Sequence, residues 1–290
     1  MSTAFQRIFQ GQIEAVICDW AGTTYDFGSM APIRAFQTLF ETNGVPITTD
    51  EAREPMGTEK REHISQLLAM PRIKKAWLER HGHDADEQVI DRLYHDFLPL
   101  QLDAIKECAQ AIPGWLDTIH ELKDRGIKIG ANTGYNREML DTLADIAKSQ
   151  GYDPDSSVCA SEVAKGRPYP HMSLKNALEL GVSDVRGCIK VDDTIPGIEE
   201  GLAAGMWTVG VTVSGNEVGC SLQTWQSLDP AEQERLRTRA VQRFRQNGAH
   251  IIIDSVADLA LAIDQVNDWL AQGLAPDSDR LVGRVITAES

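Results

Sequence analysis

The chain lacks several features that would assign it to a special class of protein. None of its apolar runs approaches the roughly 20 residues of a membrane-spanning helix. Its start, "MSTAFQRIFQGQ", lacks the charged and apolar regions of a secretory signal. It also contains no internal repeat and no low-complexity tract. We therefore expect no membrane partner and predict a cytoplasmic globular protein.

Cysteine and positive charge are scarce as well. Five cysteines among 290 residues show no CxxC or Cys/His ligand spacing, which disfavours both a disulfide scaffold and a zinc site. The 28 basic residues are outnumbered by 43 acidic ones, so the formal net charge is −15. Such a charge repels a polyphosphate backbone, and nucleic acid is not an expected partner. A small anionic substrate would need local basic groups and a metal ion to offset the overall field.

Short apolar runs recur along the chain, and each is closed by small or polar residues. They are "EAVICDW" (14–20), "GIKIGANTG" (126–134), "GCIKVDDT" (187–194), "MWTVGVTVSG" (206–215) and "AHIIIDSV" (249–256). Continuous apolar runs of this length are typical of strands buried on both faces of a parallel sheet. Segments with helical spacing lie between them, so the sequence predicts a doubly wound α/β core.

The segment from residue 28 to 104 contains no convincing strand. Its apolar residues recur at helical spacing. The expected helices cover residues 31–43, 50–69, 71–82 and 87–109, with Pro55-Met56-Gly57 interrupting the second. We predict a core domain of residues 1–27 and 105–275, an inserted helical cap of residues 28–104, and a flexible tail of residues 276–290.

Chemically useful residues follow the predicted strands, at the edge where open α/β sheets bind their ligands. Asp19 ends the first strand, Asn132-Thr133-Gly134-Tyr135 ends the second, Arg167 follows the short run "SSVCA", and Asp192-Asp193 end a later strand. A phosphoryl-transfer site requires an aspartate nucleophile, a hydroxyl beside backbone donors, a fixed cation and acidic metal ligands. All of these parts are present.

Each of these residues also has a simpler interpretation. Asp19 could cap a helix or a turn, Thr133 could bond its own loop, and Arg167 in "GRPYP" could lie on the surface. The "GTT" after Asp19 favours an anion site, because glycine and hydroxyl residues there supply N–H and O–H donors. The adjacent carboxylates of Asp192 and Asp193 repel each other, and a hard cation such as Mg²⁺ would remove that cost.

These motifs resemble those of the haloacid dehalogenase superfamily. Asp19 and Thr23 match its first motif, Thr133 its second and Asp193 its fourth, while Arg167 stands where many members have the lysine of a K-P-x-P pattern. Within the superfamily, the chain is most similar to the phosphonoacetaldehyde hydrolase family, from about residue 13 to 270. The segments that carry this likeness are "DWAGTTYDFG", "EPMGTEKREHI", "PRI", "GIKIGANTGYNREM", "GRPYP" and "AGMWTVGV".

The resemblance implies hydrolysis of the carbon–phosphorus bond of phosphonoacetaldehyde to acetaldehyde and phosphate, through a lysine imine and an aspartyl-phosphate. Most phosphatases of the superfamily have a second aspartate where this chain has Ala21, and that acid protonates a departing alcohol. A carbon leaving group needs an electron sink instead, and an imine supplies one. The family's imine-forming lysine falls on Lys60, although composition alone makes a lysine beside Glu59, Arg61 and Glu62 a solvated surface group.

The resemblance assigns roles to further residues. His63, one turn after Lys60, would move protons during imine formation, with help from Tyr135. Lys60 must be neutral to attack the aldehyde, so its pKa must be lowered by burial or by neighbouring cations. The predicted substrate- and phosphoryl-binding residues are Thr23, Met56, Gly57, Thr133, Gly134 and Arg167. The predicted Mg²⁺ ligands are Asp19, the carbonyl of Ala21 and Asp193. A homodimer is the family's expected assembly.

Some positions depart from the family pattern. Ser29 replaces a cysteine, and Gly197 stands where some members have an additional acid near the metal. Asp192 precedes the expected metal ligand Asp193, and the role of Asp26 is open between a supporting acid and a turn residue. Two alternative functions remain at this stage. One is a phosphate-ester phosphatase or phosphomutase of the same fold, which the absence of an acid at Ala21 disfavours. The other is a catalytically silent protein that binds a phosphorylated ligand.

Overall fold

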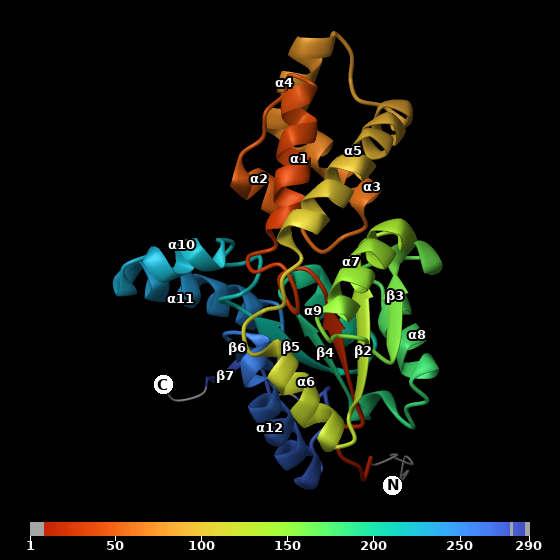
Figure 1. Cartoon of the computed structure of the whole chain (residues 1–290), viewed down its shortest axis with the longest axis vertical. Coiled ribbons are helices and arrows are strands. Elements are labelled where there is room, and N and C mark those ends of the chain that lie inside the picture. The colour runs from red at the N-terminus through yellow and green to blue at the C-terminus, as the bar shows by residue number, and fades with distance from the viewer. Residues whose placement is uncertain (1–8, 279–280, 288–290) are drawn as a thin grey trace, which may run out of the picture.

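A seven-stranded parallel sheet forms the centre of the molecule (Figure 1). The computed structural model describes residues 9–278 and 281–287. The strand order is β3-β2-β1-β4-β5-β6-β7. The strands are β1 (Ala15–Asp19), β2 (Lys128–Thr133), β3 (Ser156–Cys159), β4 (Cys188–Asp192), β5 (Trp207–Val211), β6 (Ile251–Ile253) and β7 (Arg284–Ile286). The predicted doubly wound α/β core is confirmed.

Strand β1 lies in the middle of this sheet because every one of its residues can be buried. All five, AVICD, are buried, as expected for a strand covered by helices on both faces. β1 pairs with β2 on one side, where Asp19 lies opposite Asn132, and with β4 on the other, where Cys18 lies opposite Val191. The carboxyl ends of these three strands therefore meet at one edge of the sheet.

Two layers of helices cover the sheet. One layer packs against the largest hydrophobic core and contains α6 (Trp115–Asp124), α7 (Arg137–Ser149) and α12 (Leu259–Ala271). The opposite layer contains α8 (His171–Glu179), α9 (Ile195–Ala203) and α11 (Pro230–Gln246), and the short α10 (Leu222–Ser227) precedes α11. Short 3₁₀ turns at Ala160–Glu162, Val185–Gly187 and Val256–Asp258 complete the connections. None of the helices in the described part of the chain has the length and apolarity needed to cross a bilayer.

A helical cap stands above the carboxyl edge of the sheet (Figure 1). It contains α1 (Met30–Thr42), α2 (Thr49–Arg53), α3 (Lys60–Ala69), α4 (Pro71–His81) and α5 (Glu87–Cys108). Helices α1 and α5 pack along each other, and the rings of Phe36 and Phe97 stack at 4.4 Å between them. The predicted boundary between cap and core, between residues 104 and 105, falls inside α5. The position of this boundary stays a prediction.

One expectation is confirmed by the structure and another is changed. The interruption predicted at Pro55-Met56-Gly57 divides the segment 50–69 into two helices, because α2 ends at Arg53 and α3 begins at Lys60, and the intervening Gly57 adopts φ +92°. The prediction of a flexible tail is wrong at Arg284–Ile286, which pair with β6 as an edge strand. A three-residue strand has no periodicity to recognise, and backbone pairing to β6 defines it. Residues 279–280 and 288–290 of the predicted tail lie outside the described residues.

Candidate active site

Asp19 ends β1 at the start of a tight turn. The carbonyl oxygen of Trp20 accepts hydrogen bonds from the backbone N–H groups of Thr24 and Tyr25, both at 2.9 Å, so the chain wraps around this point. Gly22 in the turn has φ +91°, and a Cβ there would collide with the carboxylate of Asp193. The "GTT" segment therefore brings the first and fourth motifs together, while its role as a source of donors for an anion stays a prediction.

Arg167 is the cation that faces Asp19. Its Nη2 donates to Asp19 Oδ1 at 2.6 Å and to Asn132 Oδ1 at 2.7 Å, while its Nε donates to Glu200 Oε2 at 2.9 Å. The Arg167 side chain is only 1% exposed. The alternative interpretation of Arg167 as a surface residue is therefore wrong, because its guanidinium is held on three sides at the edge of the sheet.

Three buried carboxylates converge beside this cation. Oxygen atoms of Asp19, Asp192 and Asp193 lie within 4.8 Å of one another. Burial raises the pKa of Asp19 to about 6, against the opposing effect of Arg167. Burial, together with the charges of Asp19 and Asp192, raises the pKa of Asp193 well above its ordinary value. Three buried carboxylates repel one another when no cation is present, and a bound metal cation would remove that repulsion.

The two adjacent aspartates differ in their partners. Asp192 Oδ2 pairs with Lys190 Nζ at 2.9 Å and with Arg167 Nη2 at 3.2 Å, and the Oδ1 accepts from Thr194. Asp193 instead accepts from neutral donors, the Thr23 hydroxyl and the Asn216 backbone N–H, each at 2.8 Å. The charge of Asp192 is thus balanced by protein cations, whereas no cation among the described residues forms an ion pair with Asp193.

The charge balance of the buried network also suits a divalent cation. Among the described residues of this network, four fully or almost fully buried carboxylates share two cations at ion-pair distance, and Lys60 contributes positive charge only from further away, so carboxylates are in excess. Hard oxygen ligands of this kind are those that Mg²⁺ prefers. The carboxylates are Asp19, Asp192, Asp193 and Glu200, and the cations are Arg167 and Lys190.

Lys60, the first residue of α3, is buried rather than solvated. The Glu59 side chain caps the helix by accepting from the N–H groups of Arg61 and Glu62, both at 3.0 Å. Lys60 is 3% exposed, and its Nζ lies 5.3 Å from the centre of the Tyr135 ring. Burial is the main reason that its pKa is lowered to about 8, and the charge of Asp19 opposes that shift. The surface interpretation of Lys60 is wrong.

His63 is fully buried one turn further along α3. Its Nε2 lies 3.0 Å from the carbonyl oxygen of Ala52, and because a carbonyl only accepts, Nε2 must carry the proton. Nδ1 is then an acceptor, and no described residue donates to it. Burial, and next the charge of Lys60, lowers the pKa of His63 well below its ordinary value. The side chain is a neutral imidazole with one free lone pair.

The remaining predicted residues line the seam between cap and core. Met56 is buried, and the carbonyl oxygen of Gly57 lies 3.4 Å from Arg167 Nη1. A Cβ at Gly134 would collide with the Thr58 carbonyl, so glycine there lets the two loops touch. Thr133 is buried, and its hydroxyl oxygen accepts a hydrogen bond from the N–H of Tyr135 at 3.2 Å. This contact agrees with the simpler interpretation, in which Thr133 bonds its own loop. Ala21 lies two residues after Asp19 in the turn.

Sequence reasoning did not select Lys190, Glu200 or Gln101. The sequence does contain a sign of the role of Lys190, because a lysine in the middle of the apolar run "CIKVD" must have buried partners for its charge. Glu200, on α9, accepts from Arg167, Asn132 and the Ser173 N–H, and nothing in its local sequence indicates these distant contacts.

The departures noted in the sequence have structural counterparts. A Cβ at Gly197 would fall on the carboxylate of Asp192, so Asp192 occupies the space of a side chain at 197. Asp26 accepts from the N–H groups of Met30 and Ala31 at 3.0 and 2.8 Å and thereby supports the start of α1. Ser29, which precedes α1, is buried in a left-handed conformation.

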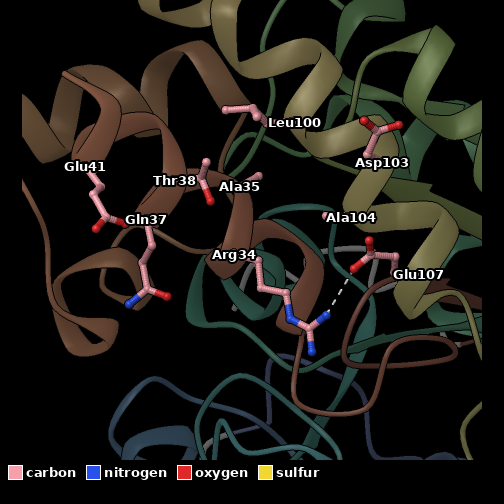
Figure 2. Close-up of a pocket in the computed structure, with 9 residues that line it drawn as sticks. All are labelled: Arg34, Ala35, Gln37, Thr38, Glu41, Leu100, Asp103, Ala104 and Glu107. Atoms are coloured by element: carbon pink, nitrogen blue, oxygen red, sulfur yellow. Dashed lines mark hydrogen bonds and ion pairs between the residues drawn. The ribbon is translucent and has the colours of Figure 1, made fainter.

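A groove on the outer face of the cap is unrelated to this cluster. It has a volume of about 450 Å³ and lies between α1 and α5, where Arg34 and Glu107 form an ion pair at 3.4 Å (Figure 2). None of the predicted site residues lines it. The candidate active site is instead the buried seam between α3 and the carboxyl ends of β1, β2 and β4.

Comparison with known proteins identifies the family. The model of the haloacid dehalogenase-like hydrolases matches residues 13–205. Phosphonoacetaldehyde hydrolase from Hahella chejuensis is 65% identical over 288 residues, 99% of this chain and 98% of the relative. The enzyme of that name from Paraburkholderia xenovorans is 45% identical over 264 residues, 91% of this chain and 99% of the relative.

A solved structure agrees with these relatives. A phosphonoacetaldehyde hydrolase like protein from Oleispira antarctica superimposes with a TM-score of 0.93 at 52% identity, covering 95% of this chain and 100% of that one. A β-phosphoglucomutase from Clostridium difficile, at 19% identity and a TM-score of 0.65, shares the fold. The chain therefore belongs to the haloacid dehalogenase-like hydrolases and, within them, to the phosphonoacetaldehyde hydrolase family.

Proposed function

We propose that the protein hydrolyses the carbon–phosphorus bond of phosphonoacetaldehyde, through an imine on Lys60 and a phosphorylated Asp19. The observation that carries this proposal is the burial of Lys60, with its lowered pKa, above a nucleophilic aspartate that has Ala21 two residues later. An amine whose pKa is lowered to about 8 has a larger neutral fraction near physiological pH than an ordinary lysine, and the neutral form condenses with an aldehyde. The names of the relatives support the same substrate.

In the first stage, the cap residues form the imine. Neutral Lys60 Nζ attacks the aldehyde carbon, and the free Nδ1 of His63 accepts the proton that the amine loses. His63 then returns that proton to the oxygen to give a hydroxyl, and a second proton taken up from solvent lets this hydroxyl leave as water, so that the imine is protonated. The Tyr135 ring lies against the resulting cation, which an aromatic face stabilises. Met56 completes the wall of this pocket.

In the second stage, Asp19 attacks phosphorus in line with the carbon leaving group. The phosphorus–carbon bond breaks, and its electron pair enters the protonated imine to give an enamine. Arg167, the Thr133 hydroxyl and the backbone at Gly57 and Gly134 bind the phosphonyl oxygens. Protonation at carbon and hydrolysis of the imine release acetaldehyde. Water then attacks the phosphorylated Asp19 and releases phosphate.

We assign the metal to Asp19, Asp193 and the carbonyl of Ala21, with Mg²⁺ as the ion. Bound there, Mg²⁺ would neutralise charge between the nucleophile and the phosphonyl oxygens. Asp193 is a better ligand than Asp192, because Asp192 already pairs with Lys190 and Arg167. The Thr23 hydroxyl, which donates to Asp193, orients that carboxylate toward the ion and the phosphoryl site.

The phosphate-ester alternative is less consistent with the site. An alkoxide leaving group would need a proton donor, and the side chain at position 21 is a methyl group. A silent binding protein would not need a buried lysine of lowered pKa beside a fully assembled carboxylate cluster. We further propose that the enzyme acts in the cytoplasm as a homodimer that pairs through its cap.

Trapping the imine tests the proposed function. The protein is incubated with phosphonoacetaldehyde and then with borohydride, and the reduced adduct is located by mass spectrometry. We expect one adduct, on Lys60. Lys165 provides a matched control, because its Nζ also lies over an aromatic ring, that of Tyr169 at 4.4 Å, but is exposed. Lys165→Arg should leave the adduct unchanged. Full phosphate release by Lys60→Arg, without an adduct, would overturn the mechanism.

A further inference from the structure

We propose that Gln101 is a positioning residue for the imine step. Its amide nitrogen donates a hydrogen bond to the hydroxyl of Tyr135. Its free Oε1 accepts a hydrogen bond from the water molecule that imine formation releases and imine hydrolysis consumes. This inference rests on the proposed function and deepens it. None of the motifs discussed above contains Gln101, which lies in the middle of α5.

The first observation is an unusual burial. The exposed fraction of Gln101 is 0%, although glutamine is ordinarily a surface residue. Its Nε2 donates to the Tyr135 hydroxyl at 3.2 Å, and Oε1 accepts from no residue that the structure describes. Exchanging the two ends of the amide would leave the nitrogen unpaired instead. A buried polar atom without a partner is destabilising, so a ligand is its natural partner.

The second observation is the surroundings of this amide. Tyr135, which Gln101 holds, presents its ring to Lys60 Nζ at 5.3 Å. Phe36 lies 5.8 Å from the same Nζ and stacks on His63 at 3.9 Å. Among the described residues around Lys60, two buried polar atoms have no partner, His63 Nδ1 and Gln101 Oε1. His63 Nδ1 is an acceptor because Nε2 faces a carbonyl, and Gln101 Oε1 is an acceptor in the amide orientation of the structure.

Imine formation supplies a hydrogen-bond donor or a proton to each of the two acceptors. The attack of Lys60 converts the aldehyde oxygen to a hydroxyl, and that hydroxyl departs as water when the imine forms. His63 Nδ1 passes the amine proton to the oxygen and a second proton comes from solvent, so a further acceptor is needed for the hydrogen bonds of the departing water among these aromatic side chains. Because Gln101 Nε2 donates to the Tyr135 oxygen, the phenolic hydrogen is free to donate to the departing oxygen.

A neighbouring contact supplies a matched control. Tyr94, also on α5, accepts at its hydroxyl from Asn136 Nδ2 at 3.2 Å. Both contacts therefore join α5 to the loop after β2, but only that of Gln101 involves the ring beside Lys60. If these hydrogen bonds serve only to dock the helix on the loop, Gln101→Met and Tyr94→Phe should have similar effects.

The experiment compares Gln101→Met, Gln101→Glu and Tyr94→Phe in the full-length enzyme with Mg²⁺. We measure the rate of borohydride-trapped adduct formation, kcat and KM for phosphonoacetaldehyde, and thermal stability. We expect Gln101→Met to lower the trapping rate and kcat about 10- to 100-fold, the lower range of proton-transfer and positioning effects, with KM within about twofold. Tyr94→Phe should stay within about twofold of the original enzyme, since it loses only one hydrogen bond. Gln101→Glu, which retains an acceptor, should recover part of the loss.

Two results would overturn the role of Gln101 alone: wild-type trapping by Gln101→Met, or an equal loss in Tyr94→Phe. If Gln101→Met does not fold, Gln101→Glu and Gln101→Asn are compared, and the amide shortened by one carbon should trap more slowly than the glutamate. Equal, unimpaired trapping by both would again overturn the proposal. Absence of an adduct in the unchanged enzyme would instead overturn the imine itself, and the Gln101 inference with it.

Discussion

At the edge of the sheet, Asp19 and Glu200 each pair with Arg167, whereas in the cap Lys60 and His63 lie among aromatic rings. The first group is crowded with charge, and Arg167 donates to these two carboxylates at 2.6 and 2.9 Å. The second group contains a lysine with no ion pair, and an imidazole nitrogen with no donor, among the described residues. Both regions are buried. The charged groups of the first region are paired with one another, whereas Lys60 and His63 Nδ1 in the second lack such partners.

This difference corresponds to the two chemical tasks we propose. Phosphoryl transfer requires charges fixed in advance around the phosphorus atom, which a paired network provides. Imine formation requires an amine that can lose its proton, and a carboxylate at bonding distance would keep Lys60 charged. The cap therefore supplies the apolar half, and the core supplies the charged half. If so, the two halves can be disabled separately.

The largest effect is expected from Asp19→Asn. The amide cannot attack phosphorus, so phosphate release should fall by about 10⁴-fold or more, as for other lost nucleophiles. Because imine formation takes place in the other half, the adduct on Lys60 should still be trapped by borohydride. Phosphate assay and mass spectrometry measure the two outcomes. Loss of the adduct together with turnover would show that the halves are not independent.

Lys60→Arg should disable the opposite half. A guanidinium stays charged and forms no imine, and turnover should fall on the order of 10³-fold, comparable to the loss of other groups used in the transition state. The carboxylate cluster is untouched, so addition of Mg²⁺ should still raise the thermal midpoint as in the original enzyme. A lost response to Mg²⁺ would contradict the separation of the two halves.

Glu200→Gln tests how far the paired network fixes Arg167. Removal of this buried charge leaves Arg167 and Lys190 with fewer counter-charges, so kcat/KM should fall about 10- to 100-fold, as for a lost charge-stabilising group. The free energy of unfolding should drop by about 3 kcal/mol, as is typical when one partner of a buried ion pair is removed. Urea unfolding measures it. The matched control is Glu199→Gln, an exposed neighbour, which should change neither quantity; equal effects of the two variants would exclude a specific role.

The smallest effect concerns pH. The pKa of Lys60 is lowered to about 8, mainly by burial, and the neutral amine is the reactive form. Below that pKa, the neutral fraction falls about tenfold for each pH unit, so trapping with cyanoborohydride should slow toward pH 6 and level off above about pH 9. Gln101→Met, which introduces no charge, should retain the same midpoint. A trapping rate that is constant from pH 6 to 9 would show that Lys60 does not limit the step.

Much of the core was predictable from local sequence, because strands buried on both faces must be apolar throughout. Asp19 could be placed at a ligand-binding edge for the same reason, since the apolar run stops there. Strand β7 could not be predicted from local sequence, because its three residues show no alternation and only their pairing with β6 defines the strand. The break in the segment 50–69 was predictable, since Pro55 and Gly57 are residues that interrupt helices, and α2 and α3 lie on either side of it.

The sequence by itself determined which chemical groups are available: an aspartate nucleophile, a lysine, and a methyl group at Ala21 where an acid would assist an alcohol. Only the tertiary structure decided that Lys60 is buried, because its neighbours Glu59, Arg61 and Glu62 are those of a surface helix. Burial comes from Tyr135, a residue 75 positions away by sequence numbering. The pKa of an amine depends on what surrounds it in space, and local sequence does not contain that information.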